Sequence, residues 1–350
     1  MSDTRALIVG LPNPVLLVGA QGRIQGLNGP AKRLIGTDAT GWHYITALRQ
    51  PALLDAVEET LKDGGHRHAS YLGNDGARDT TWNVSVRGVA LSDGLTVVLS
   101  FQDMTAVEEA GEMRRDFVAN VSHELRTPLT SLMGFIETLR GPAKKDTAAQ
   151  DRFLGIMEQE AGRMYSLVEA LLQLSRVEGQ ERSRPTTKVG LQTLVLEVLN
   201  TLQSTADAKG LRFDTQMPDD TVEVLGDRDQ LWQVISNLVE NALKYGATSG
   251  DITIRLSSPD YEPTLLQSGV RLCVIDRGEG IPAHHITRLT ERFYRVDSHR
   301  GREVGGTGLG LAIVKHIINR HRGRLRIAST MGQGAEFKVI LPIGAEGNSE

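Results

Sequence analysis

Residues 226–245, GDRDQLWQVISNLVENALKY, contain the clearest helical pattern in the C-terminal half of the chain. Asp227, with Gln230 three positions later, resembles the capping box that starts a helix. The apolar residues that follow recur at three- and four-residue spacings, which indicates an amphipathic helix with one buried face; they are Leu231, Val234, Leu238 and Ala242. A second helix near 191–209 and strands near 222–225, 252–256, 270–275, 325–328 and 337–341 complete a predicted α/β domain.

The polar face of the 230–245 helix carries candidate ligands. Asn237 and Asn241 are four residues apart, so their amides lie on one face, and Lys244 follows one turn later. Two neutral oxygen donors suit a Mg²⁺ ion that already shares phosphate oxygens, and the lysine suits the phosphates themselves. Two asparagines alone are better explained as an ordinary polar helix face, so this pattern depends on the other motifs.

A first glycine-containing motif, Asp276-Arg277-Gly278-Glu279-Gly280, follows the predicted buried strand at 270–275. A carboxylate at a strand end can accept a hydrogen bond from an exocyclic amine, and glycines let the backbone approach a flat ring closely. The pattern Asp-x-Gly-x-Gly also describes many ordinary turns, so it indicates a nucleotide pocket only together with the other motifs.

A second glycine motif, Gly305-Gly306-Thr307-Gly308-Leu309-Gly310-Leu311, opens a predicted helix that ends near Arg320. Free backbone amides at a helix N-terminus form an anion site. No Gly-Lys-Ser/Thr follows, so this is not a Walker loop, and the glycines follow a polar loop instead of the strand that a dinucleotide fold requires. Between the two motifs lies an arginine-bearing segment able to close over phosphates as a lid: Arg292, Phe293, Arg295, Arg300 and Arg302.

The middle of the chain contains a third motif, residues 122–128, SHELRTP. Each helical residue turns about 100°, so His123 lies roughly 200° from both Val121 and Leu125. If those two face a helical core, His123 faces solvent, where Glu124 can orient the imidazole or accept its proton. Pro128 removes one helical hydrogen bond and should kink the helix just past the histidine. From periodicity alone, an ordinary exposed histidine is the better explanation.

Residues 105–182 predict two long helices joined by a loop at 141–147. Their apolar residues recur at spacings compatible with heptad seams: Val118, Val121, Leu125, Leu132 and Leu139, then Phe153, Met157, Met164, Leu167, Leu171 and Leu174. One hairpin cannot bury both seams, so two hairpins paired as a four-helix bundle, and hence a homodimer, are predicted. The alternative is two helices packed on another domain of the same chain. A polar, proline-containing linker at 183–190 follows.

The front of the chain predicts a small α+β domain. Its apolar runs are broken by turn residues, with strands at 15–18, 81–89 and 95–101, helices at 31–35 and 51–62, and a hairpin turn at Ser92-Asp93-Gly94. His43, His66 and His68 could hold haem or a metal, but positions in exposed loops are the better explanation.

The bulk properties exclude several classes of protein. A chain of 350 residues with 40% hydrophobic and 23% charged residues suits two or three globular domains. Only 5% aromatics and a net charge of -4 argue against a general nucleic-acid binder. The single cysteine, Cys273, predicts a buried thiol in a reducing compartment. No run approaches the ~20 apolar residues of a membrane span, and no signal peptide is seen, so we expect a cytoplasmic protein.

Taken together and in this order, the motifs make the chain resemble the sensor histidine kinases of bacterial two-component systems, over about Val118 to Leu341. Residues 289–297 and 117–121 look most like the phosphate-regulon sensor kinases. The front resembles a PAS domain through residues 26–28 and 102–105. The resemblance implies a multidomain α+β fold: a PAS-like α/β sensor domain at 6–104, an antiparallel helical hairpin at 105–182 that forms a dimeric four-helix bundle, and a gyrase-type α/β sandwich that binds ATP at 187–345.

The resemblance also implies roles for individual residues. His123 would be the phosphoacceptor, Glu124 its general base, and Thr127 would position water when the kinase dephosphorylates its partner. Asn241, aided by Asn237, would hold Mg²⁺. The remaining residues implied for ATP are Lys244 and Tyr245 near the phosphates, Asp276 on adenine N6, Arg295 in the lid, and Gly278, Gly280, Gly306, Gly308, Leu309 and Gly310, which shape the pocket and lid.

By the same resemblance, the protein is a homodimer that phosphorylates itself from Mg-ATP, passes the phosphoryl group to a receiver-domain aspartate of a response regulator, and has phosphatase activity toward it. In gyrase-like ATPases a glutamate in the position of Asn237 activates water, so the asparagine fits transfer to an imidazole. Competing classes are a non-catalytic scaffold, a gyrase-like ATPase and a protein-serine kinase. Membrane-bound relatives carry transmembrane helices ahead of the PAS domain; here we expect input from a cytoplasmic ligand or protein partner, with peripheral membrane or protein-complex association as an alternative.

Overall fold

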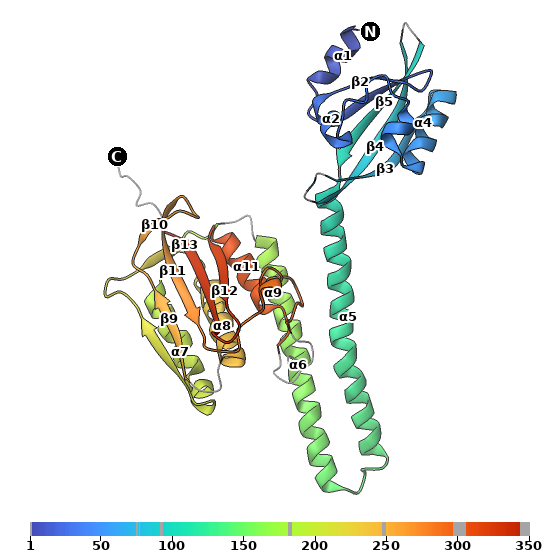
Figure 1. Ribbon diagram of the computed structural model, residues 1–350. Coiled ribbons are helices and arrows are strands. Elements are labelled where there is room, and N and C mark those ends of the chain that lie inside the picture. Colours follow the sequence, from blue (N-terminus) through green and yellow to red (C-terminus); the bar gives the residue numbers. More distant parts are fainter. Residues whose placement is uncertain are drawn as a thin grey trace. The chain divides into compact units, whose positions relative to one another are not determined.

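The computed structural model describes residues 2–74, 76, 78–91, 94–180, 184–246, 250–296 and 306–343. The chain divides into two compact units, Met1–Ala119 and Asn120–Glu350, and the long helix α5 (Thr105–Arg140) belongs to both (Figure 1). The predicted mixed α+β architecture, with a helical region and an ATP-binding domain, is confirmed.

The N-terminal unit is built on a five-stranded antiparallel sheet with the strand order β2-β1-β5-β4-β3. Its strands are β1 (Val15–Gly19), β2 (Ile24–Leu27), β3 (His66–Asn74), β4 (Asp79–Leu91) and β5 (Gly94–Asp103). Helices α2 (Gly29–Ile35), α3 (Tyr44–Leu48) and α4 (Pro51–Asp63) lie between β2 and β3 in the chain. Residues 92 and 93 of the predicted hairpin turn lie outside the described residues, but β4 and β5 do pair as antiparallel neighbours.

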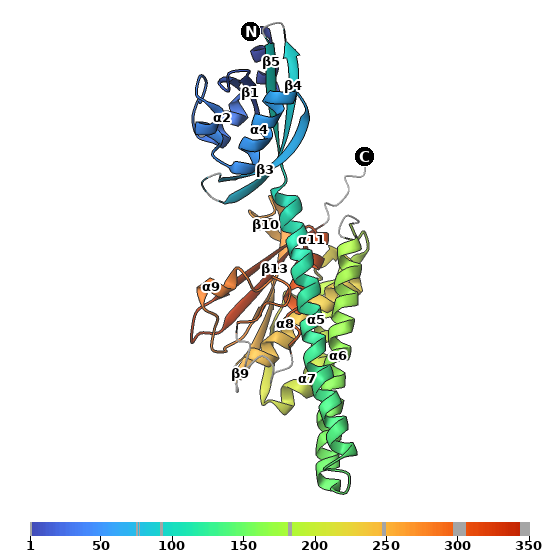
Figure 2. The same ribbon diagram turned by 90° about the vertical axis from the view of Figure 1, so that its right-hand side faces the viewer.

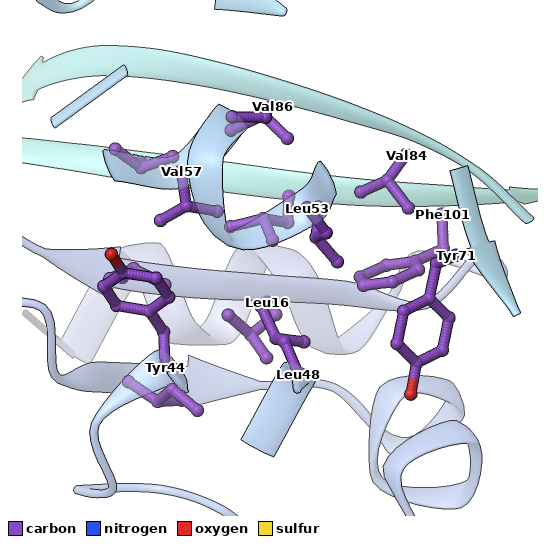
Figure 3. Close-up of a cluster of buried hydrophobic side chains, with 14 of the residues drawn as sticks. Leu16, Tyr44, Leu48, Leu53, Val57, Tyr71, Val84, Val86 and Phe101 are labelled. Atoms are coloured by element: carbon purple, nitrogen blue, oxygen red, sulfur yellow. The ribbon is translucent and has the colours of Figure 1, made fainter. Parts of the chain in front are cut away.

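Side chains from this sheet and its helices fill one continuous apolar core (Figure 3). Leu53 and Val57 of α4 are spaced one helical turn apart and are fully buried. Tyr71 and Phe101 meet edge to face with ring centroids 5.5 Å apart. A smaller cluster on the sheet joins Ile8 of α1 (Ser2–Val9) to Val15, Leu17 and Val98.

Two details of this unit bear on function. Asp103, the last residue of β5, accepts hydrogen bonds from the Thr105 amide and hydroxyl, at 2.9 and 2.6 Å, and the Thr105 hydroxyl accepts from the Thr81 amide at 3.0 Å. The start of α5 is therefore tied to both β4 and β5.

The expectation that His66 and His68 lie in loops was wrong, because both belong to strand β3, where their ring centroids are 4.6 Å apart.

In the second unit, α5 and α6 (Thr147–Gln180) run side by side as an antiparallel hairpin, as predicted (Figures 1 and 2). Phe135 and Phe153 stack between them with centroids 5.3 Å apart. A second set of apolar side chains remains exposed on the hairpin at spacings of three, four, seven or eleven residues: Leu129, Met133 and Ile136 on α5, and Leu154, Tyr165, Val168 and Leu172 on α6. The hairpin alone therefore leaves an apolar stripe uncovered.

The C-terminal part of this unit is a six-stranded sheet whose main path is β12-β13-β11-β9-β7, with β10 paired to β11. One face of it is covered by α7 (Leu191–Ala208), α8 (Arg228–Tyr245) and α11 (Gly310–Arg320) (Figures 1 and 2). The strands are β7 (Leu211–Gln216), β9 (Gly250–Leu256), β10 (Asp260–Glu262), β11 (Gln267–Ile275), β12 (Arg324–Ser329) and β13 (Ala335–Pro342). A short helix, α9 (Ala283–Ile286), follows β11.

The predicted linker at 183–190 is partly wrong. Lys188–Gly190 forms strand β6, which pairs with β8 (Glu223–Leu225) because Val189 is buried opposite Val224. Only 181–187 separate α6 from the ATP-binding domain, and 181–183 lie outside the described residues. Cys273 is buried in the central strand β11, as expected, and burial raises the pKa of its thiol to about 11. Across the described part of the chain, no helix combines the length and apolarity needed to cross a bilayer.

Candidate active site

His123 lies near the middle of α5 and its side chain is exposed. Glu124, the next residue, is also exposed, while Pro128 is buried and the helix continues through it to Arg140. Because Pro128 has no amide hydrogen, the carbonyl of Glu124 loses its usual donor. The Thr127 hydroxyl donates to the carbonyl of His123 at 3.2 Å. The helix therefore presents an accessible imidazole with a carboxylate beside it.

Helix α8 begins where the sequence predicted, with the Asp227 side chain accepting from the Gln230 amide at 3.3 Å. The reciprocal half of the predicted capping box is absent, because the Asp227 amide donates to Nε2 of His321 at 3.0 Å. Arg320 also reaches the Asp227 carboxylate, with Nη1 and Oδ2 3.1 Å apart. The start of α8 is thus fixed to the end of α11, and this brings the two helices that carry candidate phosphate ligands together.

The asparagine face of α8 points at the start of α11. Asn237 donates through Nδ2 to the carbonyl of Gln233 at 2.9 Å, so its Oδ1 faces the other way. A Cβ atom on Gly310 would lie 2.7 Å from that Oδ1, so Gly310 leaves the space that the amide oxygen occupies. Asn241 lies one turn further along and is half-buried. The Lys244 ammonium pairs with Glu240 at 3.0 Å.

Asp276 directly follows strand β11 and is 6% exposed. Its Oδ1 accepts from the amides of Gly278, at 2.8 Å, and Ala335, at 3.3 Å. Burial raises the pKa of this carboxyl, while the two backbone hydrogen bonds act in the opposite direction. Within the described residues only Oδ1 is engaged, so Oδ2 remains able to accept a hydrogen bond from a ligand.

Glycines are required around this carboxylate for steric reasons. A Cβ on Gly278 would come within 2.3 Å of the Tyr245 carbonyl, and a Cβ on Gly280, where φ is 77°, would come within 2.2 Å of the Thr330 carbonyl. Gly334, which the sequence analysis did not single out, has φ of 82° and would collide with the carbonyl of Asp276. Gly334 lies in the turn between β12 and β13, and a single glycine at such a turn gave no sequence signal for the site.

The glycine-rich loop before α11 packs on the arginine-bearing segment. The Phe293 amide donates to the Gly308 carbonyl at 2.9 Å, and a Cβ on Gly308, where φ is 70°, would lie 2.9 Å from Phe293 backbone atoms. Leu309 is fully buried, and its amide donates to the Thr307 hydroxyl at 3.3 Å. A Cβ on Gly306 would meet the Tyr245 hydroxyl at 2.9 Å. Tyr245 itself is half exposed. Of the predicted lid residues, Gly305, Arg300 and Arg302 lie outside the described residues.

Arg295 carries the observation that points most directly to an anion. Its Nε and Nη2 are buried and have no hydrogen-bond partner among the described residues. Buried guanidinium nitrogens without an acceptor are costly, and planar guanidinium groups are well matched to phosphate oxygens. The arrangement therefore fits a nucleotide phosphate at this point of the lid segment.

The second unit also contains polar contacts that sequence reasoning missed. Arg292 Nη2 lies 2.6 Å from Oε1 of Glu178 on α6, and Nε2 of His316 on α11 lies 3.5 Å from the same oxygen. Gln233 of α8 donates to Gln173 of α6 through a short hydrogen bond. These contacts join residues 60 or more positions apart, and isolated Glu and Gln residues on an amphipathic helix give no sequence signal for them.

Two parts of the chain match known protein families. Residues 226–345 match the family described as histidine kinase-, DNA gyrase B-, and HSP90-like ATPase, and residues 113–180 match the His Kinase A (phospho-acceptor) domain. The matched segments contain the asparagine face, the glycine motifs and His123. The chain belongs to the sensor histidine kinases of two-component systems.

One relative is the phosphate regulon sensor protein PhoR of Pseudomonas aeruginosa, which is 42% identical over 67% of this chain and 52% of its own length. Another is the sensor protein kinase WalK of Staphylococcus aureus, which is 32% identical over 96% of this chain and 80% of its own length. WalK of Staphylococcus saprophyticus is 33% identical over 96% of this chain and 54% of its own. The chain thus spans about half the length of PhoR and of the latter WalK. The histidine kinase ThkA, crystallised with the response regulator protein TrrA, has the same fold, with a TM-score of 0.51 at 21% identity, covering 96% of this chain and 97% of its own.

Proposed function

We propose that this chain is an ATP-dependent histidine kinase that phosphorylates its own His123. The observation that carries the proposal is the pairing of an exposed imidazole on α5 with a nucleotide-type pocket in the same structural unit. Three features support ATP as the ligand: the glycines that admit close backbone approach and, within the described residues, the unpartnered Nε and Nη2 of Arg295 and the Oδ2 of Asp276. The family match at 226–345 supports the same ligand.

The residues of α8 fit a magnesium ion bound with ATP. Asn237 directs its amide oxygen toward the N-terminus of α11, and Asn241 follows on the same face. Neutral amide oxygens are ligands that Mg²⁺ accepts when phosphates supply the remaining charge. When bound, Mg²⁺ would neutralise charge on the phosphate oxygens. Asn237 and Asn241 would hold it, Lys244 and Arg295 would contact phosphates, and Asp276 would accept from the adenine amine.

The proposed reaction is a phosphoryl transfer to nitrogen. A ring nitrogen of His123 forms a bond to the γ-phosphorus while the bond from that phosphorus to the bridging oxygen breaks, and its electron pair leaves with ADP. The proton on the other ring nitrogen passes to Glu124, so that a neutral phosphoimidazole remains. The exposed position of Glu124 beside the ring supports this role. The backbone amides at the start of α11 supply fixed dipoles for the phosphates.

Labelling with γ-radiolabelled ATP tests this function. The wild-type chain should take up label that is acid-labile and base-stable, as a P–N bond requires, and His123→Gln should take up none while still binding nucleotide. Acid-stable label would indicate a protein-serine kinase, and release of phosphate without label would indicate a gyrase-like ATPase. No label and no nucleotide binding would leave a scaffold and refute the kinase.

We further propose that the phosphoryl group passes to an aspartate of a response regulator, and that Thr127, one turn beyond His123, positions water when the reaction runs as a phosphatase. The likeness to ThkA, which is seen with a response regulator, supports such a partner. A phosphate-regulon regulator is the first to test because PhoR is 42% identical, although WalK aligns over more of the chain. Phosphotransfer measured against every response regulator of the host decides between them.

The exposed stripe on the hairpin supports a homodimer, since a second hairpin would bury Leu129, Met133 and their neighbours in a four-helix bundle. The strand order β2-β1-β5-β4-β3, with its helices between β2 and β3, supports a PAS-like sensor domain. The hydrogen bonds of Asp103 and Thr105 support transmission of its signal through the start of α5. Because the proposed substrate is ATP, the catalytic part would work in the cytoplasm.

A further inference from the structure

The glycine-rich loop that opens α11 lies against the helical hairpin of its own chain. Gly306 and Thr307 line one small pocket together with Glu124 and Pro128 of α5 and with Arg163, Met164 and Leu167 of α6. Glu124 follows His123 directly, and Pro128 lies about one helical turn further on. The loop that opens α11 therefore reaches the stalk at the level of the histidine.

A second set of contacts holds the ATP-binding domain on the same α6. Glu178 pairs with Arg292 of the lid segment and contacts His316 of α11. Gln173 accepts the short hydrogen bond from Gln233 of α8. Leu174 and Val177, which lie on the same stretch of α6, are 1% and 3% exposed. Three separate segments of the domain therefore contact this end of the helix.

These two contact regions fix how far the domain extends along its own stalk. Helix α6 rises about 1.5 Å per residue, so Arg163 and Glu178 are roughly 22 Å apart along it. The connection between α6 and β6 is seven residues, 181–187, and begins three residues beyond Glu178. A domain attached there and anchored at Glu178 covers the stalk from the linker to the level of His123 without leaving its own hairpin.

From this we infer that His123 receives the phosphoryl group from ATP bound to the same chain, so that autophosphorylation runs within a subunit and not across the dimer. The inference rests on the proposed kinase function and adds the identity of the accepting chain. The bonds formed and broken are those given above; what the structure adds is that the Gly306–Thr307 loop and Glu124 belong to one polypeptide at one pocket.

Heterodimers of the full chain test the inference. Two forms that carry different affinity tags, one enlarged so that the chains separate on a gel, are co-expressed and purified through both tags. The first heterodimer combines a His123→Gln chain, whose ATP site is intact, with an Asn241→Ala chain, whose histidine is intact. The matched control combines a wild-type chain with a chain that carries both substitutions. Radiolabelled ATP is the probe, and a fluorescent ATP analogue verifies that the His123→Gln chain binds nucleotide.

Transfer within the subunit predicts opposite results for the two pairs. The wild-type chain of the control heterodimer should be labelled to about half the level of the wild-type homodimer, because one of two sites is active, and the first heterodimer should stay at background. Label on the Asn241→Ala chain, with or without loss from the control, would overturn the inference. A wild-type homodimer that takes up no acid-labile label would instead refute the kinase function itself, so the two failures are distinguishable.

Discussion

Replacement of Asp276 by asparagine should change the base preference of the nucleotide pocket while leaving the fold intact. Oδ1 of Asp276 already accepts from the amides of Gly278 and Ala335, so an asparagine would keep its oxygen there. Its amide group would then occupy the position of Oδ2, where a donor replaces an acceptor. Because burial raises the pKa of the Asp276 carboxyl, the neutral amide should not destabilise the domain.

The magnitude follows from the hydrogen bond that is lost. A hydrogen bond to a charged group contributes about 1.5–3 kcal/mol, which corresponds to a Kd for ATP weaker by about tenfold to a hundredfold. The adenine amine and the new amide would both be donors, so no substitute bond can form. Guanine has a carbonyl oxygen where adenine has the amine, and that oxygen can accept from the new amide. The ratio of GTP to ATP affinity should therefore rise in Asp276→Asn.

Titration calorimetry with ATP and GTP on the wild type and on Asp276→Asn measures both effects, and the thermal midpoint of the domain verifies folding. Asp276→Ala is the matched comparison: it should lose ATP affinity without gaining GTP affinity, and it leaves the amides of Gly278 and Ala335 without their acceptor, which should lower stability by about 1–3 kcal/mol. An Asp276→Asn variant that binds ATP as tightly as the wild type, with an unchanged midpoint, would refute the assignment of Asp276 to the base.

Glu178→Gln should slow labelling of His123 about two- to fivefold, because a partly exposed ion pair contributes up to about 1 kcal/mol. Glu158→Gln, at an exposed position of the same helix, should not slow it. Uptake of radiolabel from ATP measures both rates. Gly308→Ala should weaken nucleotide binding about tenfold, because a side chain at this left-handed φ costs about 1–2 kcal/mol and meets the Phe293 backbone. Gly190→Ala, at φ -77° with open space around it, should leave nucleotide binding unchanged. The folded pKa of Cys273 is raised from 9.0 to about 11, so the folded state keeps this proton longer than the unfolded state does. The free energy of unfolding should thus fall as pH rises from about 9 to 11, by up to about 3 kcal/mol, and urea titrations of Cys273→Ala should lack this loss.

Much of the fold could be predicted because its elements have strong local periods. The 3.6-residue repeat of α8 and the long seams of the hairpin identify helices within about two residues of their ends. The short strands β6, β7 and β10 were not predicted. Strand β7 has one fully buried residue, Leu211, in a polar run, and its pairing with β9 depends on partners far away in the chain. Such strands exist because of tertiary pairing and not because of local preference.

The candidate residues of the site could be named from sequence only because several modest motifs occur together and in one order, since each motif alone has a more ordinary explanation. What sequence reasoning could not supply is the surroundings that orient them. The donation from Asn237 to Gln233, which turns the amide oxygen toward Gly310, follows from rotamer and helix phase together. Gly334 matters only because the carbonyl of Asp276 lies where its side chain would be. Both the Asn237 hydrogen bond and the space at Gly334 depend on distances between residues in the folded chain, which no sequence pattern specifies.

The polar contacts that anchor the ATP-binding domain to α6 are weak because their side chains stay partly exposed to solvent. Glu178 and Arg292 keep about a third of their side-chain surface exposed, at 35% and 29%. Exposed ion pairs of this kind stabilise by about 0–1 kcal/mol, and a neutral hydrogen bond such as that between Gln233 and Gln173 adds about 1 kcal/mol. These polar contacts alone would not prevent the domain from leaving the stalk on the time scale of domain motions. Gly306 and Thr307 line the same pocket as Glu124. If the proposed transfer to a response regulator takes place, the domain has to leave this surface before a receiver domain can reach His123. Strengthening the anchor should therefore favour autophosphorylation at the expense of transfer to the regulator.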